Sequence, residues 1–325
     1  MLFRGVGFSY FTIQKRFSWG KMSLFRVLLF SILPMIALGQ MFVESYWESW
    51  VLKDYPDDYC ALLKDVPASP IGSTFGANYI DIAFGDYSGG FGGVEVNDSV
   101  IREGIEAIHA KGGKVKIAYG GALYSMQIYI QNQMQAMAFA QSLKDVKDNF
   151  GIDGVDFDVE DGGVDGQLQM EVMKAVRATC GDDFHISYTL PCLSSQFEPW
   201  TSTLVLSHQY LDAVNVMAYD YYWPGYSFDQ DIAVLEGLGI PRSKMVFGLM
   251  PGHHDAGNEY TSLDEALNST RFAKSSGLAG MMTWDINRDC DQRKGYPQGD
   301  DNLFQTGLPP ATFLNTISAE INNGN

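Results

Sequence analysis

The chain has 325 residues, 46% of them hydrophobic, which is enough for one large buried core. It carries 39 acidic and 22 basic residues, a formal net charge of −17, and so acidic a body repels nucleic acid and anionic membrane surfaces. No low-complexity tract divides the chain and no interior run is long and apolar enough to span a membrane, so we predict one large domain with a neutral or cationic partner.

Residues 1–39 differ from the rest of the chain in having five basic residues and no acidic ones. A basic segment that opens at Met22 precedes an apolar run over residues 27–38, and the small residues Ala37 and Gly39 fit positions −3 and −1 of a cleavage site. We therefore predict a secretory signal cleaved after Gly39, with Met22 as a candidate translation start, and a secreted, extracellular protein. The alternative is a membrane anchor, for which the apolar run is short. Without this segment the chain has 17 basic and 39 acidic residues, a net charge of −22.

The remaining chain contains four cysteines, Cys60, Cys180, Cys192 and Cys290. In a secreted protein an even number allows two disulfides, here in any of three connectivities. There is no Cys-x-x-Cys pair and no Cys/His cluster, so we expect no metal site. The triplets that begin at Asn97 and Asn268 fit N-glycosylation on a eukaryotic secretory route.

From residue 42 onward, short β-rich runs alternate with longer helical patterns. We predict strands at residues 42–47, 79–85, 115–119, 154–160, 184–190, 214–219, 245–250 and 280–284. The clearest helical patterns cover residues 99–111, 127–149, 167–179, 263–276 and 311–322. Eight strands, each followed by a helix or helical loop, predict an α/β fold, a single-domain (β/α)8 TIM barrel over residues 40–325. The competing fold, a doubly wound open sheet, lacks its glycine-rich fingerprint after the first strand.

The fourth predicted strand has acidic side chains on one face, because side chains alternate along a strand. Asp156, Asp158 and Glu160 point into the barrel, while the apolar residues between them point toward the surrounding helices. Confined carboxylates raise each other's pKa, so Glu160, at the open end, is predicted to hold a proton near neutral pH and to act as a general acid. A solvated strand face conflicts with the apolar opposite face. A Mg²⁺ or Ca²⁺ site conflicts with strand geometry, which cannot wrap ligands around one ion.

The segment Asp153-Gly154-Val155-Asp156-Phe157-Asp158-Val159-Glu160 resembles the signature of family 18 glycoside hydrolases, Asp-Gly-x-Asp-x-Asp-x-Glu on the fourth barrel strand. This family includes chitinases and endo-β-N-acetylglucosaminidases. Residues 114–121 are similar to its third strand, residues 215–220 to its sixth-strand pattern Met-x-Tyr-Asp, and residues 280–285 to its eighth strand, which carries a tryptophan at the floor of the active site. The resemblance runs from about residue 42 to residue 284.

The resemblance implies a retaining mechanism in which the substrate assists its own hydrolysis. Glu160 is implied to protonate the glycosidic oxygen and later to serve as base, and the 2-acetamido oxygen attacks the anomeric carbon. Asp158 orients the acetamido N–H with Asp156 as its buried partner, and Tyr219 donates its hydroxyl to the acetamido oxygen. Asp153, on the opposite face, is assigned a structural role. Further substrate-binding residues are Tyr46, Phe84, Gly120, Met217, Asp220 and Trp284.

Three features lie outside the family pattern. Ala118 stands where the family's third strand has serine, so a hydroxyl that usually bonds the buried acids is missing. His253 and His254 match no motif and are expected to be a surface pair. Tyr221, Tyr222 and Trp223 follow the sixth strand and either stack on further sugars or pack the loop.

An endo-acting chitinase is our first prediction, with chitin or N-acetylglucosamine oligosaccharides as partner. Only residues 251–279 separate the last two strands, which leaves no room for the extra α+β domain of relatives with deep clefts and favours internal cuts. The alternatives are an endo-β-N-acetylglucosaminidase acting on N-glycans and a chitin-binding lectin, although such lectins typically lack the glutamate that is present here as Glu160. We expect a monomer without cofactor or stable membrane anchor.

Overall fold

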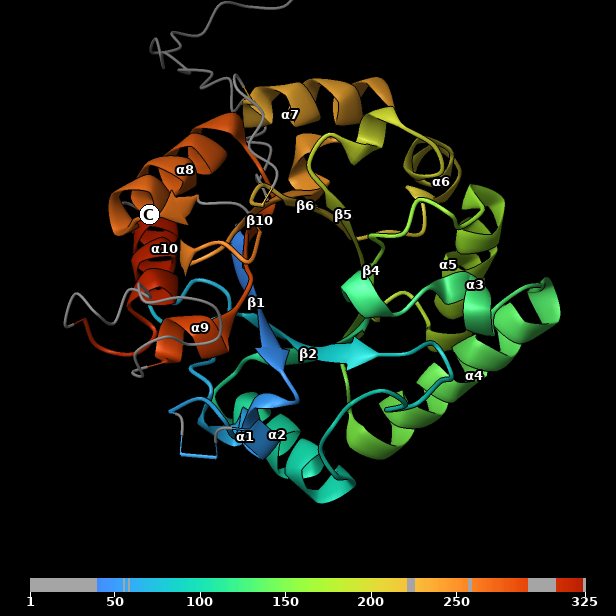
Figure 1. Ribbon diagram of the computed structural model, residues 1–325, viewed down its shortest axis with the longest axis horizontal. Coiled ribbons are helices and arrows are strands. Elements are labelled where there is room, and N and C mark those ends of the chain that lie inside the picture. The colour runs from blue at the N-terminus through green and yellow to red at the C-terminus, as the bar shows by residue number, and fades with distance from the viewer. Residues whose placement is uncertain are drawn as a thin grey trace, which may run out of the picture. The chain divides into compact units, whose positions relative to one another are not determined.

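A closed barrel of eight parallel strands forms the centre of the protein. The computed structural model describes residues 40–54, 56–57, 59–220, 226–256, 259–291 and 308–323. The strands are β1 (Phe42–Glu48), β2 (Tyr79–Gly85), β3 (Lys114–Gly120), β4 (Gly154–Asp158), β5 (His185–Pro191), β6 (Ala213–Met217), β7 (Met245–Leu249) and β10 (Gly280–Thr283), paired in the order β1-β10-β7-β6-β5-β4-β3-β2. Figure 1 shows the strands around the centre and the helices outside them. The predicted (β/α)8 barrel is confirmed.

Ten α-helices connect or follow the described strands. They are α1 (Val51–Asp54), α2 (Asp98–Ala110), α3 (Met126–Tyr129), α4 (Gln133–Phe150), α5 (Gly166–Cys180), α6 (Trp200–Ser207), α7 (Phe228–Gly237), α8 (Leu263–Ser276), α9 (Ile286–Cys290) and α10 (Thr312–Asn322). None of the helices in the described ranges is long and apolar enough to cross a membrane.

The helix predicted over residues 127–149 is two helices. Asn132 has an extended backbone, and its side chain accepts a hydrogen bond from the backbone N–H of Gln135. Asparagine in this position caps a helix N-terminus, so α4 begins at Gln133 as a separate element.

The chain between β7 and β10 is short, as predicted. It forms α8 and a two-stranded hairpin of β8 (Gly252–His253) and β9 (Tyr260–Thr261). In the described part of this connection there is no α+β domain, which agrees with the prediction of a simple barrel.

Two strands end two residues earlier than the sequence predicted, at the open end of the barrel. β4 ends at Asp158 and β6 ends at Met217. Glu160 and Tyr219 therefore lie two residues past their strands. These loop positions lie at the C-terminal mouth of the barrel, where TIM-barrel active sites are built.

The two faces of β4 contact different parts of the protein. Val155 and Phe157 point outward into the main hydrophobic core between barrel and helices. Asp156, between them, points inward and is completely buried. Strand register places Ala118 of β3 and Ser187 of β5 directly opposite Asp156, one on each side. The barrel interior therefore contains a polar layer beneath the mouth.

One disulfide is formed, between Cys60 and Cys290, whose Cα atoms are 5.8 Å apart. The other two cysteines, Cys180 and Cys192, are buried and form no disulfide, so only one of the two disulfides that four cysteines allow is present. Cys180 ends α5 before β5 begins, whereas Cys192 follows the end of β5. A seven-residue strand at roughly 3.3 Å per residue separates the two thiols, which places them near opposite ends of the barrel.

Candidate active site

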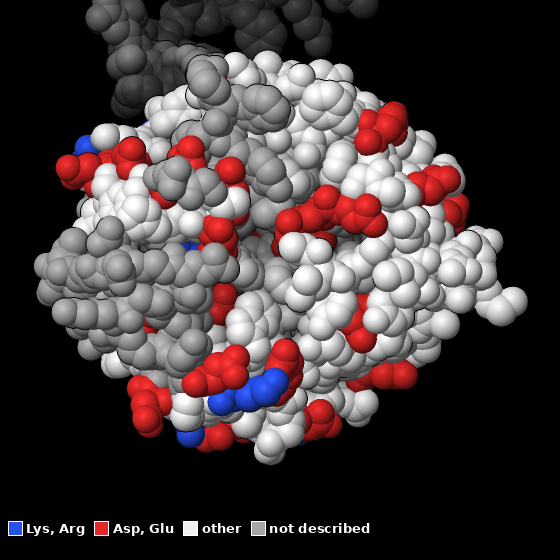
Figure 2. All heavy atoms as spheres, in the orientation of Figure 1, with Lys and Arg blue, Asp and Glu red and all other residues white. Residues whose placement is uncertain are grey.

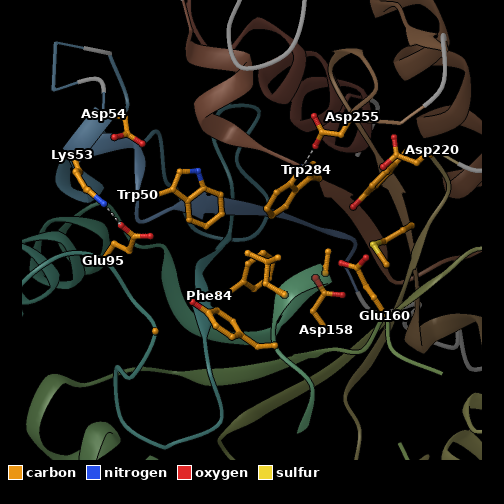
Figure 3. A pocket seen from close by; sticks show the side chains of 16 residues that line it. Trp50, Lys53, Asp54, Phe84, Glu95, Asp158, Glu160, Asp220, Asp255 and Trp284 are labelled. Carbon is orange, nitrogen blue, oxygen red and sulfur yellow. Dashed lines mark hydrogen bonds and ion pairs between the residues drawn. The ribbon is translucent and has the colours of Figure 1, made fainter. Parts of the chain in front are cut away.

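A cavity of about 480 Å³ lies at the C-terminal ends of the barrel strands. Seven of the ten residues predicted from the sequence line it: Phe84, Asp158, Glu160, Met217, Tyr219, Asp220 and Trp284. Figure 3 shows Asp158 and Glu160 on one side of this cavity, with Trp284 and Asp220 facing them. Segments far apart in sequence therefore meet at one mouth.

The cavity lining is acidic. Six carboxylic acids and one lysine contribute to it: Asp54, Glu95, Asp158, Glu160, Asp220, Asp255 and Lys53. Lys53 is paired with Glu95 at 3.1 Å. On the face seen in Figure 2, Asp and Glu side chains are much more abundant than Lys and Arg. This charge suits a neutral or cationic substrate and disfavours an anionic one.

Asp156 lies beneath the cavity and accepts three hydrogen bonds. Its Oδ2 accepts from the Tyr46 hydroxyl at 2.7 Å, and its Oδ1 accepts from Ser187 Oγ at 2.6 Å and from Thr189 Oγ1 at 2.9 Å. Burial raises the pKa of Asp156, while the nearby Lys116 ammonium acts in the opposite direction. Three donors around one carboxylate favour its ionised form.

Asp158 lies between Asp156 and Glu160 and is 3% exposed. Its Oδ1 is buried without a hydrogen-bond partner among the described residues. Burial raises the pKa of Asp158 well above its usual range, and the charges of Glu160 and Asp156 raise it further. A buried carboxyl oxygen without a donor is costly, so this atom is suited to receive a donor from a bound molecule.

Glu160 has the electrostatics of a proton donor at neutral pH. Burial raises its pKa to about 7, and the charge of Asp220 acts in the same direction. The sequence predicted a raised pKa from the neighbouring acids of β4, but Asp220 comes from the loop after β6. A carboxyl group with a pKa near 7 is suited to general acid and base catalysis.

Asp220 is held by the hairpin that follows β7. The Asp220 N–H donates to His254 Nδ1 at 3.2 Å, and Asp220 Oδ1 accepts from the N–H of Ala256 at 3.1 Å. His254 is 5% exposed, and its Nε2 lies 2.7 Å from Thr261 Oγ1. Burial lowers the pKa of His254 to about 4, so its neutral ring accepts at Nδ1 and donates at Nε2. The prediction that His254 belongs to a surface pair is wrong.

Aromatic rings form the apolar side of the cavity. Trp284 stacks on Phe84 with ring centroids 5.4 Å apart, and Phe84 stacks on Trp50 at 6.2 Å. Tyr46 meets the edge of Trp284 at 5.5 Å from below. The Trp284 indole N–H donates to Asp255 Oδ2 at 2.9 Å, as the dashed line in Figure 3 shows. Flat apolar surfaces of this kind suit the faces of sugar rings.

Comparison with known proteins identifies the family. The profile described as "Glycosyl hydrolases family 18" matches residues 45–251, which include β4, Glu160 and the β6 loop. The chain belongs to glycosyl hydrolase family 18. No relative among the curated proteins matches this chain.

Solved structures share the fold of this family 18 protein. A family 18 chitinase from Pseudoalteromonas aurantia is 22% identical with a TM-score of 0.59, covering 76% of this chain and 95% of that one. A chitinase from Rhizomucor miehei is 17% identical with a TM-score of 0.59, covering 86% and 100%. A chitinase-like agglutinin from Robinia pseudoacacia is 16% identical with a TM-score of 0.61, covering 86% and 99%. At these identities the likeness concerns the fold alone.

Three residues predicted from the family 18 pattern do not line the cavity. Asp156 and Tyr46 lie beneath it and hydrogen-bond each other. Gly120 has φ +119°, and a Cβ there would clash with the carbonyl oxygen of Asp158. Glycine at this position therefore permits the close approach of β3 and β4. Its observed contact is with Asp158 rather than with the cavity.

The motifs did not reveal nine of the lining residues. They are Trp50, Lys53, Asp54, Gly93, Glu95, Ala122, Leu123, Tyr124 and Asp255. One available signal was that Trp50 and Tyr124 follow the C-terminal ends of barrel strands, where functional residues gather. Tyr221, Tyr222 and Trp223, which had two open interpretations, lie outside the described residues.

Asp153 lies outside the barrel interior, in agreement with its structural assignment. Its Oδ2 accepts from the N–H of Val115 at 2.9 Å and lies 2.8 Å from His109 Nε2. These contacts tie the start of β4 to β3 and to α2.

Proposed function

We propose that this protein is a secreted, endo-acting chitinase that hydrolyses β-1,4-N-acetylglucosamine linkages by a retaining, substrate-assisted mechanism. The observation that carries the proposal is the pairing of two acids at the cavity. Glu160 has a pKa of about 7, and beside it Asp158 has a buried Oδ1 without a donor among the described residues. The first is suited to proton transfer, and the second is suited to an acetamido N–H.

In the first step Glu160 transfers its proton to the glycosidic oxygen while the bond from that oxygen to the anomeric carbon breaks. The carbonyl oxygen of the 2-acetamido group forms a bond to the same carbon from the other face, giving an oxazolinium ion. The leaving chain departs as an alcohol, and Glu160 is left as a carboxylate. No carboxylate of the protein is needed as nucleophile, which is the exception this family makes among glycosidases.

Asp158 and Tyr219 position the acetamido group for that attack. Asp158 Oδ1 accepts the acetamido N–H, and the negative charge of the Asp156–Asp158 pair stabilises the positive charge that develops on nitrogen. Tyr219 is buried at the same cavity, and burial together with the charges of Asp158 and Glu160 raises the pKa of its hydroxyl well above its usual range. The hydroxyl therefore stays protonated and donates to the acetamido oxygen.

Water completes the cycle from the face that the leaving chain vacated. Glu160, now a carboxylate, takes a proton from the water while the water oxygen bonds to the anomeric carbon. The oxazolinium ring opens, the acetamido group is restored, and the configuration is retained. Trp284 and Phe84 supply the apolar surface beneath the reacting sugar.

The simple connection between β7 and β10 supports internal cleavage. In its described part only the hairpin β8–β9 and α8 stand beside the mouth, so no extra domain forms a wall there. A long polymer can therefore enter from the side, which favours cuts within the chain.

The test of function compares three substrates and one variant. The chain freed of residues 1–39 is incubated with chitin oligosaccharides, with insoluble chitin and with a high-mannose glycopeptide, alongside Glu160→Gln. We expect cleavage of the oligosaccharides with the β-anomer formed first, as observed by ¹H NMR. We expect Glu160→Gln to lose at least about a hundredfold in kcat/KM, because a general acid contributes that much.

Other outcomes of this test select other functions. Cleavage of the glycopeptide alone identifies an endo-β-N-acetylglucosaminidase. Binding of chitin oligosaccharides without any product identifies a lectin, and activity retained in Glu160→Gln contradicts the role of Glu160.

The proposal of secretion has its own support. The Cys60–Cys290 disulfide is typical of oxidising compartments, and the Asn97 side chain of the first glycosylation triplet is exposed. Expression of the full chain in a secreting eukaryotic host tests it. The mature protein is expected in the medium with Gln40 as its first residue, and retention in the cell contradicts the proposal.

A further inference from the structure

The barrel interior beneath the cavity contains several carboxyl groups and one lysine. Four completely or almost completely buried carboxyl groups lie there, on Glu44, Asp81, Asp156 and Asp158. Among the described strand residues, Lys116 is the one fully buried lysine or arginine. Four acids cannot all ionise around a single ammonium group, so the position of that group decides which of them carry the negative charge.

Lys116 Nζ has three partners in this interior. It lies 2.8 Å from Glu44 Oε2 and 3.2 Å from Asp81 Oδ1, and it donates to Ser187 Oγ at 2.7 Å. Burial alone lowers the pKa of Lys116, but the charges of Asp81 and Glu44 outweigh it and raise the pKa above the usual value. The ammonium form is therefore stable even without water around it.

The direction of the hydrogen bonds follows from this charge. An ammonium group has no lone pair, so Ser187 Oγ must accept from Lys116. Ser187 therefore donates its single hydroxyl proton to Asp156 Oδ1, 2.6 Å away. The two hydrogen bonds therefore point the same way, from Lys116 to Ser187 and from Ser187 to Asp156. They end on a carboxylate oxygen of Asp156 that also accepts a hydrogen bond from Thr189.

We propose that Lys116 and Ser187 form a relay that holds Asp156 as the anion and replaces the hydroxyl missing at Ala118. Strand register supports the replacement, because Ala118 lies opposite Asp156 on the β3 side and Ser187 lies opposite it on the β5 side. A donor lost from one neighbouring strand is supplied by the other, with a lysine behind it. Lys116 and Ser187 act through Asp156 and are positioning residues.

The relay determines where the proton of the acid pair resides. With Asp156 fixed as the anion, a proton shared by Asp156 and Asp158 belongs to Asp158, whose pKa its burial and neighbouring charges already raise. The titratable groups that face Asp156 are Tyr46 and Glu44 from β1, Asp81 from β2, Tyr87 from the segment after β2, Lys116 from β3 and Asp158 from β4. Lys116 is the one cation among them.

The test removes the serine hydroxyl and leaves the ion pairs of Lys116 intact. In Ser187→Ala the Asp156 carboxylate loses one donor, so the acid pair gives up its proton at higher pH. This inference rests on the proposed hydrolysis, in which the acidic limb of the pH profile of kcat/KM reports the acids of the free enzyme. We expect that limb to move up by on the order of one pH unit, the size of one hydrogen bond to a charged group. The alkaline limb, set by Glu160, is expected to stay in place.

Rescue and control variants separate the relay from a general effect on packing. Adding Ala118→Ser to Ser187→Ala returns a hydroxyl to the other side of Asp156 and is expected to move the acidic limb back. Ser45→Ala is the matched control, because Ser45 is equally buried on a strand and its Oγ lies 2.7 Å from Thr283 Oγ1 instead of an acid. It is expected to leave the pH profile unchanged. Lys116→Met is expected to move the limb further than Ser187→Ala if it folds.

A second measurement tests the relay without any substrate. The side-chain carboxyl of Asp156 is followed by ¹³C NMR in protein labelled at aspartate, and it is assigned by its loss in Asp156→Asn. Ser187→Ala is expected to raise the pH at which this signal titrates. If the wild-type chain cleaves no chitin oligosaccharide at any pH, the proposed function fails while this titration still decides the relay. Unchanged titration and an unchanged acidic limb in Ser187→Ala overturn it.

Discussion

At the scale of single residues, the proposed mechanism predicts that the alkaline limit of activity is set by Glu160 and by the charge of Asp220 across the cavity. Burial is the largest cause of the raised pKa of Glu160, and the Asp220 charge is the second. Burial raises the pKa of Asp220 itself to about 6, so Asp220 is mostly ionised where Glu160 titrates.

Asp220→Asn tests this electrostatic coupling. Asparagine keeps the Oδ1 acceptor that meets the Ala256 N–H at 3.1 Å but carries no charge. Without the negative neighbour, Glu160 loses its proton at lower pH, so the alkaline limb of the kcat/KM profile is expected to move from about 7 toward lower pH. The measurement is kcat/KM on chitin oligosaccharides between about pH 4 and 9. A limb that moves upward or stays in place contradicts the coupling.

The residues of the site were predictable from the sequence where one strand carries them. Alternation along β4 correctly placed Asp156 and Asp158 inside the barrel. Contacts between loops were not predictable in this way. His254 was expected at the surface, but it is buried because Asp220 and Thr261 provide its hydrogen bonds. No local pattern in the sequence reports such partners.

At the scale of elements, the strands were predicted within a few residues because each is an apolar, β-rich run bounded by polar segments. Four helices had no clear pattern. Among these, α6 has the sequence Trp-Thr-Ser-Thr-Leu-Val-Leu-Ser, which lacks helical periodicity, and α1 is a single turn of four residues. These helices form where the barrel supplies a surface to cover, which is tertiary information.

The connection after β7 positions the tryptophan at the end of β10. Asp255 accepts the Trp284 indole N–H with Oδ2 and pairs through Oδ1 with Arg288 of α9, which also donates to the carbonyl of His253 at 2.6 Å. Arg288 is 4% exposed, so this ion pair is largely protected from water. The hairpin and α9 thereby hold the indole ring against Phe84.

Asp255→Ala is expected to lower kcat/KM on chitin oligosaccharides about tenfold, because the indole loses its acceptor and the loss of one hydrogen bond is worth roughly 1 kcal/mol or slightly more. Asp255→Asn keeps an acceptor for Trp284 and is expected to lose less. Glu106→Ala, on the exposed surface of α2, serves as the control for removal of a carboxylate. If Asp255→Ala has the wild-type kcat/KM, Trp284 does not need this partner.

At the scale of the whole barrel, one covalent bond joins the segment after the first barrel strand to the helix after the last one. Cys60 lies in the segment after β1, and Cys290 ends α9 after β10, so the disulfide spans 230 residues. The carbonyl of Cys60 also accepts from Trp47 Nε1 at 2.9 Å and from Asn287 Nδ2 at 3.0 Å. Since β1 and β10 are neighbours, the bond fastens the barrel where its first and last strands meet.

The pairing itself was not predictable, because four cysteines allow three connectivities and spacing alone does not select one. What selects it is closure of the barrel, which brings residues from the two ends of the sequence together. Cys180 and Cys192 stay apart because a strand lies between them. The protein is therefore expected to contain two thiols that become reactive only on unfolding, when burial no longer raises the pKa of Cys180, which is about 11 in the fold.

The double variant Cys60→Ser, Cys290→Ser tests how much this bond stabilises the fold. Crosslinking so distant residues removes conformational entropy from the unfolded chain, by up to about 5 kcal/mol in the loop-entropy account. We expect the variant to keep its activity on chitin oligosaccharides, because neither cysteine lines the cavity, and to unfold at lower urea concentration than oxidised wild type. Wild type reduced with dithiothreitol is the matched control and is expected to unfold near the variant. Equal unfolding midpoints for oxidised wild type and variant contradict a stabilising role, and a thiol count other than two in unfolded, unreduced protein contradicts the pairing.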